Sequence, residues 1–242
     1  MPSIAPPSRS DRSPLGVLAA IIRVPLYVVL GGLVLLALSE LPPFAGWLAI
    51  IGGEGTQVGL LAGHWQSDSG AVCPDGLQEV DVNLAVARRV EALLRAEGYQ
   101  AEVLPEYAPK LVGFRARAFV AIHADSCLGD LSGFKVAHHA DADPLGPGAR
   151  LAAILSREYA RVTGLSPHPN TITDDMRLYH ALRKIAPDTP GVIIECGFLS
   201  GDRDLLTRDQ DRVAGGIAAG VAAFLEAEEA MRPIAARAPE HL

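Results

Sequence analysis

Short apolar runs along this chain alternate with longer segments in which apolar side chains recur every three or four residues. In residues 79–97 they recur from Val82 through Val86 to Val90, the spacing of one face of an α-helix, and Gly98 follows as an expected helix terminator. The same pattern predicts helices over residues 149–162 and 203–225. Apolar runs of strand length predict buried strands at residues 58–62, 100–104, 118–122, 133–138 and 191–195.

The order of these segments predicts the fold class. Strands alternate with helices from residue 57 onward, which is typical of α/β folds, where helices cover a sheet of mainly parallel strands. We therefore expect a single three-layer α/β/α domain with a mainly parallel mixed sheet over residues 57–226. A charged C-terminal tail is expected over residues 227–242.

An N-terminal hydrophobic helix is expected to precede this domain. Residues 15–38 carry a single charge, Arg23, and are long enough to span a bilayer if that side chain reaches toward the headgroups. The uncharged part, residues 24–38, also suits the core of a signal peptide. Residues 15–38 are thus a transmembrane anchor or a cleaved signal peptide, and residues 39–56 a linker. The arginines of the polar tail, residues 1–14, place that tail in the cytoplasm and the domain outside it.

Composition excludes several classes of protein. The chain has 242 residues, of which 49% are hydrophobic and 20% charged, and this balance argues against a disordered chain. A net charge of -7 argues against a nucleic-acid-binding protein that works through bulk electrostatics. Three cysteines are too few for a disulfide-dense small domain or a four-cysteine zinc site.

Three of the predicted strands lead into a residue that can bind a metal or carry a proton: His64, His123 and Glu195. Glu79 begins the helix that follows the loop after His64. The carboxyl ends of parallel strands form one crevice, so these side chains are expected to meet there. Two histidines and one carboxylate can hold zinc with a fourth position left for water, and a second carboxylate can then transfer protons. Ordinary roles also fit the spacing, namely a hydrogen-bonded structural histidine, a carboxylate at a helix N-terminus and a buried ion pair.

The short sequences around these residues resemble those of the zinc-dependent N-acetylmuramoyl-L-alanine amidases of the Amidase_3 type, in the same order over residues 58–225. They are Gly63-His64-Trp65-Gln66, Asp68-Ser69-Gly70-Ala71, Gly76-Leu77-Gln78-Glu79, Ala121-Ile122-His123-Ala124-Asp125, Gly133-Phe134 and Glu195-Cys196-Gly197-Phe198. Trp65 and Gln66 stand where that family has two glycines, and Asp125 where it usually has asparagine. These departures bear on substrate preference, because none of them replaces a ligand.

The resemblance implies a function and a role for each residue. His64, Glu79 and His123 would hold one Zn²⁺ ion, and Glu195 would be the catalytic carboxylate. The substrate would be the amide between N-acetylmuramic acid and L-alanine in peptidoglycan, in the bacterial cell envelope, with the enzyme anchored to the membrane or secreted. Two alternatives remain: a catalytically silent peptidoglycan-binding or regulatory module, and a zinc peptidase or deacetylase with another substrate. No protein activator is identified.

The cysteines add one expectation about the loops of this site. Cys73 and Cys127 follow His64 and His123 respectively, so the two loops are neighbours if both histidines bind one ion. In an exported protein a Cys73–Cys127 disulfide is therefore predicted. Cys196 is expected in the core, because alternation along its strand points it away from Glu195.

Overall fold

A computed structural model describes residues 57–231, which fall within one compact unit. A five-stranded sheet with the order β2-β1-β3-β5-β4 forms its centre. Strands β2, β1, β3 and β5 are parallel, and β4 is antiparallel to β5. The mainly parallel mixed sheet that the sequence predicts is confirmed. The strands are β1 (Val58–Ala62), β2 (Ala101–Pro105), β3 (Ala118–Asp125), β4 (Lys135–His138) and β5 (Gly191–Phe198).

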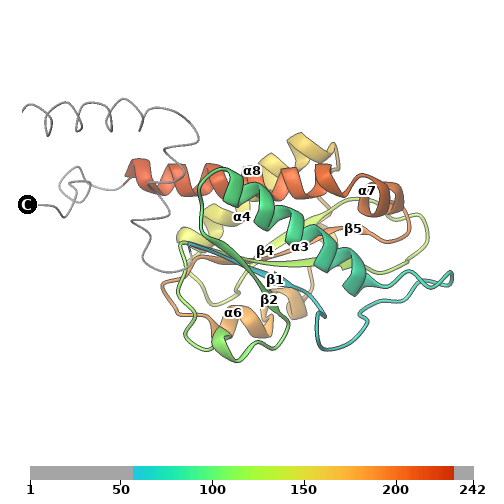
Figure 1. The fold of residues 1–242 in the computed structure, drawn as a ribbon, viewed down its shortest axis with the longest axis horizontal. Coiled ribbons are helices and arrows are strands. Elements are labelled where there is room, and N and C mark those ends of the chain that lie inside the picture. Colours follow the sequence, from blue (N-terminus) through green and yellow to red (C-terminus); the bar gives the residue numbers. More distant parts are fainter. Residues whose placement is uncertain (1–56, 232–242) are drawn as a thin grey trace, which may run out of the picture. The chain divides into compact units, whose positions relative to one another are not determined.

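Three long helices cover one face of the sheet, together with the short helix α7 (Arg203–Arg208) beside the last of them, and other short helical segments, including α6 (His180–Lys184), cover the opposite face (Figure 1). The long helices are α3 (Glu79–Ala96), α4 (Pro147–Thr163) and α8 (Gln210–Met231). Their buried apolar side chains form one cluster with Ile122 and Ile194 of the sheet. The opposite face packs against Met176 and Leu182, among others. The remaining short helical segments are η1 (Pro109–Leu111), η2 (Pro169–Thr171) and α5 (Asp174–Arg177).

The central strands extend further than their apolar runs. β3 continues through His123 to Asp125, with an irregularity in its pairing with β5 between these two residues, and β5 continues through Glu195 to Phe198. His123 and Glu195 therefore lie within the paired part of their strands, near its end, whereas His64 lies beyond the end of β1. Backbone pairing with the neighbouring strand fixes the position of His123 and Glu195. The pattern of side chains alone underestimates these strands, because the ladder is formed by the backbone.

Helix α8 also runs beyond its predicted end at residue 225, to Met231. Its buried residues include several glycines and alanines, which allow close packing, and a Cβ atom added at Gly220 would collide with Leu155 of α4. The predictions for residues 1–56, including the N-terminal hydrophobic helix, lie outside the described residues. Within residues 57–231, the structure contains no helix that is long and apolar enough to cross a membrane.

Candidate functional site

His64 lies in the turn that follows β1, beside the neighbouring strand β3. The backbone N–H of Gly63 donates to the carbonyl of Ile122 at 3.0 Å, which places this turn directly against His123. A Cβ atom at Gly63 would overlap the imidazole ring of His123, so only glycine leaves room for both histidines. His64 and Gln66 both adopt left-handed backbone conformations, with φ of 65° and 61°. Gln66 therefore takes a conformation that favours glycine, at a position where the amidases that the chain resembles have one.

Glu79 is the first residue of α3 and reaches back over the turn that carries His64. Its Oε1 accepts from Asn83 Nδ2 at 3.0 Å and from the backbone N–H of Ala124 at 3.3 Å. Its Oε2 accepts from the backbone N–H of Ala71 at 3.1 Å. Both oxygens of this buried carboxylate are thus fixed by donors from the helix, from β3 and from the preceding loop.

The two histidines and Glu79 converge on one point. Nε2 of His64 lies 3.3 Å from Oε2 of Glu79, and Nδ1 of His123 lies 3.0 Å from Oε1. One ligand atom from each of the three residues lies within 4.8 Å of the other two. Two nitrogens and one carboxylate oxygen at these separations fit the donor set of a zinc site with an open position. The structure therefore brings together the three residues that the sequence proposes as ligands, in an arrangement that suits a divalent cation.

The contacts within this cluster favour the charged form of each of its three side chains. The hydrogen bond to Glu79 raises the pKa of His64 to about 9, against the effect of burial. Burial opposes ionisation of Glu79, but hydrogen bonds from His123 and His64 outweigh it and hold its pKa well below the usual range. Burial likewise opposes charging of His123, and the bond to Glu79 with the neighbouring carboxylates raises its pKa. An ionised carboxylate thus faces two basic imidazoles.

Glu195 lies beside these residues on β5, where it is the register partner of His123 on β3. Residues paired across a ladder project from the same face, so the carboxylate and the imidazole lie side by side. Glu195 is partly exposed, but its Oε2 is buried and has no hydrogen-bond partner among the described residues. Burial raises the pKa of Glu195 to about 7, with the charge of His123 opposing the rise and that of Glu79 adding to it.

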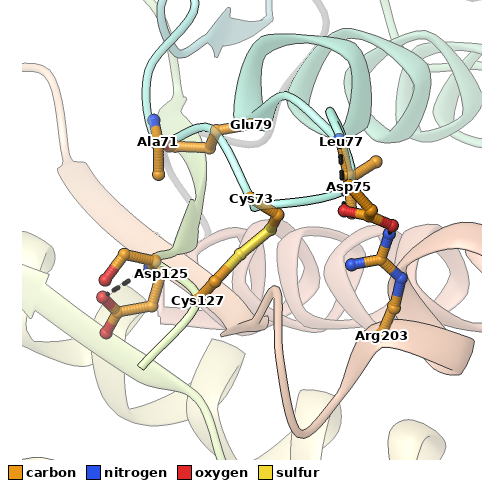
Figure 2. The surroundings of a disulfide bond; sticks show 9 residues. Ala71, Cys73, Asp75, Leu77, Glu79, Asp125, Cys127 and Arg203 are labelled. Carbon is orange, nitrogen blue, oxygen red and sulfur yellow. Dashed lines mark hydrogen bonds and ion pairs between the residues drawn. A yellow bond between two sulfur atoms is a disulfide. The ribbon is translucent and has the colours of Figure 1, made fainter. Parts of the chain in front are cut away.

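A disulfide joins the two loops that flank the site. Cys73, in the loop between β1 and α3, is bonded to Cys127, which follows β3, with their Cα atoms 5.7 Å apart. Figure 2 shows the bond between the segment that leads to Glu79 and the segment that leaves Asp125. The predicted pairing is confirmed. Cys196 is unpaired and buried in the core, as expected from the alternation along β5.

Sequence reasoning missed several residues that support this cluster. Asp68 Oδ1 lies 2.6 Å from His64 Nδ1, and Asn83 bridges Glu79 and the carbonyl of Gly63. Both stand four residues after the side chain that they contact, so this spacing could have indicated them. Glu106 follows β2 as His64 follows β1, and the same strand-end reasoning applied to that strand finds it.

Comparison with known proteins agrees with this geometry. The family model of N-acetylmuramoyl-L-alanine amidases, Amidase_3, matches residues 58–223. An uncharacterized protein of Bacillus subtilis (strain 168), YqiI, is 28% identical over 186 residues, which cover 72% of this chain and 86% of that protein.

Solved structures give the same result. The catalytic domain of CwlV, an N-acetylmuramoyl-L-alanine amidase from Bacillus (Paenibacillus) polymyxa var. colistinus, is 28% identical with a TM-score of 0.55, covering 71% of this chain and 99% of that one. AmiC2, the amidase of Nostoc punctiforme, is 27% identical with a TM-score of 0.54, covering 72% and 99%. The chain described here belongs to the N-acetylmuramoyl-L-alanine amidase family, Amidase_3, a class of amide hydrolases.

Proposed function

We propose that this chain is a zinc-dependent amidase that cuts the bond between N-acetylmuramic acid and L-alanine in peptidoglycan. The observation that carries the proposal is the convergence of ligand atoms of His64, Glu79 and His123 within 4.8 Å of one another. Beside them lies the carboxylate of Glu195, whose Oε2 has no hydrogen-bond partner within residues 57–231. Family membership supports the substrate class. The three converging residues would hold one Zn²⁺ ion, which would supply Lewis-acid chemistry by polarising the amide carbonyl and the attacking water.

Glu195 is the acid/base of this proposal. A pKa of about 7 allows its carboxylate to accept a proton at neutral pH and to release it again. Oε2 takes a proton from the water that attacks the carbonyl carbon, and the same proton passes to the nitrogen as the carbon–nitrogen bond breaks. The products are the lactyl carboxylate of N-acetylmuramic acid and a free amino terminus on L-alanine. The water supplies one oxygen of the new carboxylate and the amide carbonyl supplies the other, so the reaction needs no further reactant.

His64 is oriented for its role by Asp68. A histidine that binds a metal through one nitrogen usually donates from the other to a carboxylate or carbonyl. Nε2 of His64 faces Glu79, and Nδ1 faces Asp68 at 2.6 Å. Asp68 therefore selects the tautomer that leaves the Nε2 lone pair available, and the backbone N–H of Gly70 donates to the same carboxylate oxygen at 2.8 Å.

The cell envelope is the proposed location of this protein, because peptidoglycan, the proposed substrate, lies there. Residues 15–38 would anchor the chain to the membrane or direct its export, with residues 1–14 in the cytoplasm and 39–56 as linker. The catalytic domain would comprise residues 57–226. Membrane fractionation of cells that express the full chain tests the anchor, because a cleaved signal peptide would leave the protein in the soluble extracytoplasmic fraction.

The catalytic proposal is tested with the full chain and purified peptidoglycan. New L-alanine amino termini are quantified by labelling and mass spectrometry, first with the protein as purified, then after chelation, then after zinc is restored. We expect the termini to appear, to be abolished by the chelator and to return with zinc. Alanine in place of His64 or His123 should abolish them. His138→Ala is the matched control, because His138 pairs with Val192 at the opposite end of β5.

Three outcomes would contradict the proposal. Cleavage that persists without metal rules out the zinc mechanism. Binding to peptidoglycan with no new amino termini favours a catalytically silent module. New termini at a different bond of the stem peptide, or loss of acetyl groups, favour a zinc peptidase or deacetylase.

A further inference from the structure

Glu106 is a buried carboxylate that lies behind the candidate metal site, on the residue that follows β2. Only 4% of it is exposed. The polar groups around its side chain belong to two site residues, His64 and His123, and to residues 179–180. Its backbone N–H donates to the carbonyl of Trp65 at 3.1 Å, so the end of β2 is held against the turn that carries His64.

One oxygen of Glu106 controls the backbone of His64. Oε2 accepts from the N–H of His64 at 2.7 Å. His64 has φ of 65°, a left-handed conformation that is unfavourable for a residue with a side chain. A charged acceptor aimed at that N–H stabilises this conformation. Glu106 therefore favours the turn in which Nε2 of His64 faces Glu79.

The other oxygen of Glu106 acts on His123 through Tyr179. The hydroxyl of Tyr179 donates to Oε1 of Glu106, and the same hydroxyl lies 3.0 Å from Nε2 of His123. A hydroxyl has one proton, so a hydroxyl that donates to a carboxylate can only accept from the imidazole. Nε2 of His123 therefore carries a hydrogen. Nδ1 lies 3.0 Å from Oε1 of Glu79, and when a metal ion takes the place of the proton on Nδ1, the ring would already be the tautomer whose Nδ1 lone pair faces the ion. The order Glu106–Tyr179–His123 thus selects the tautomer that can bind a metal through Nδ1.

A third contact keeps this carboxylate in place. Nε2 of His180 lies 2.6 Å from Oε1 of Glu106. The ring of Tyr107 stacks on the ring of His180 with 4.6 Å between centroids. Both oxygens of the carboxylate are therefore held in place, Oε2 by the backbone N–H of His64 and Oε1 by Tyr179 and His180.

We propose that Glu106, with Tyr179, is the positioning element of the metal site: it holds the backbone of one histidine ligand and the ring orientation of the other. The inference rests on the proposed function, because it assumes that His64 and His123 bind zinc. Glu106 is not one of the three residues whose ligand atoms converge, and its own approach to a ligand, 3.9 Å from Oε2 to Nε2 of His123, is on the side of the ring away from Glu79. The structure thus assigns a carboxylate behind each histidine, Asp68 for His64 and, through Tyr179, Glu106 for His123.

The test measures zinc affinity in the full chain by competition with a chromophoric chelator. Tyr179→Phe removes one hydroxyl, and Glu106→Gln removes the charge. Each variant has a matched control. Tyr159→Phe removes another buried tyrosine hydroxyl, which donates to the carbonyl of Cys196 at 2.6 Å. Asp202→Asn neutralises another buried carboxylate that accepts from backbone N–H groups.

We expect Tyr179→Phe and Glu106→Gln to bind zinc about 10- to 100-fold more weakly than the unmodified chain, the usual effect of losing a partner behind a metal ligand. The two control variants should bind within about twofold of it. A second readout is the visible spectrum of the cobalt-loaded chain, which reports ligand geometry. Its bands should change in the two test variants and stay unchanged in the controls.

The outcomes separate this inference from the proposed function. An unmodified chain that binds no zinc overturns both. An unmodified chain that binds zinc, together with test variants of equal affinity and equal cobalt spectrum, overturns the positioning role alone. The thermal midpoint of each metal-free variant shows whether it folds. If Glu106→Gln fails to fold, Tyr179→Phe decides the outcome, because it deletes a single atom from a partly exposed side chain.

Discussion

Replacing Glu195 by glutamine is expected to make the metal-free chain more stable at high pH and to leave it nearly unchanged at low pH. Burial raises the pKa of this carboxyl from 4.5 to about 7. Below pH 4.5 the group is protonated in the folded and the unfolded chain, so it contributes no pH dependence. Between pH 4.5 and 7 the unfolded chain loses this proton first, and the free energy of unfolding falls as the pH rises. Above pH 7 the loss is complete.

The size of the effect follows from the same two values. One pKa unit corresponds to about 1.4 kcal/mol, so an ionised Glu195 lowers the free energy of unfolding by at most about 3 kcal/mol. Glu195 is partly exposed, which makes this figure a ceiling. Glutamine stays neutral at every pH and leaves the other titrating groups in place. The difference in stability between variant and unmodified chain should therefore grow from pH 4 to pH 8.

Urea unfolding in the presence of a chelator measures this difference, with the disulfide kept intact. Glu226→Gln, on the exposed end of α8, controls for the change in net charge. A stability difference for Glu195→Gln that stays constant from pH 4 to pH 8 would refute the reasoning, and so would a variant that is less stable than the unmodified chain at pH 8.

Three further predictions concern turnover, the disulfide and the close contact between the two histidines. Zinc-loaded Glu195→Gln should retain its metal while turnover falls by about 10²–10⁴. The kcat/KM of the unmodified enzyme should fall in acid, because only the ionised form of Glu195 accepts a proton. Replacing Cys73 and Cys127 by serine opens a loop of 54 residues and should lower the free energy of unfolding by about 4 kcal/mol, measured in urea. Gly63→Ala should weaken zinc binding at least about tenfold by displacing the adjacent imidazole ring. The control Gly215→Ala lies in α8, where the added Cβ meets no atom closer than 3.9 Å, and it should stabilise the chain by about 0.5–1 kcal/mol.

Each of these predictions has an outcome that contradicts it. Full activity of Glu195→Gln removes the role of that carboxylate. An unchanged urea midpoint for the serine variant means that the disulfide does not restrict the unfolded chain. Tight zinc binding by Gly63→Ala means that the two histidines do not need their present approach.

Much of the fold is predictable because the sheet is buried on both faces. The apolar part of its central strands forms continuous runs, and helix α3 shows apolar residues at helical spacing from Val82 to Val90. The short helices α5 and α6 were not predicted, since a helix of four or five residues is too short for a periodic pattern. These segments are determined by their contacts with the second face of the sheet.

Some residues of the candidate site can likewise be found from the sequence, and others cannot. His64, His123 and Glu195 are visible in the sequence because polar residues interrupt or follow apolar runs on adjacent parallel strands. Tyr179 gives no such signal, because it lies between two short helices and meets His123 only through the tertiary fold. The partners that orient the ligands are thus the part of the site that needed a structure.

Zinc content per chain is the measurement that tests the central claim most directly. Native mass spectrometry of the full chain, run in parallel with Glu79→Gln and His138→Ala, counts bound ions without relying on turnover. We expect one zinc ion in the unmodified chain and in His138→Ala, and none in Glu79→Gln at the same zinc concentration. An unmodified chain that takes up no zinc, or a Glu79→Gln variant that holds it as tightly, would contradict the claim that these three side chains form a metal site.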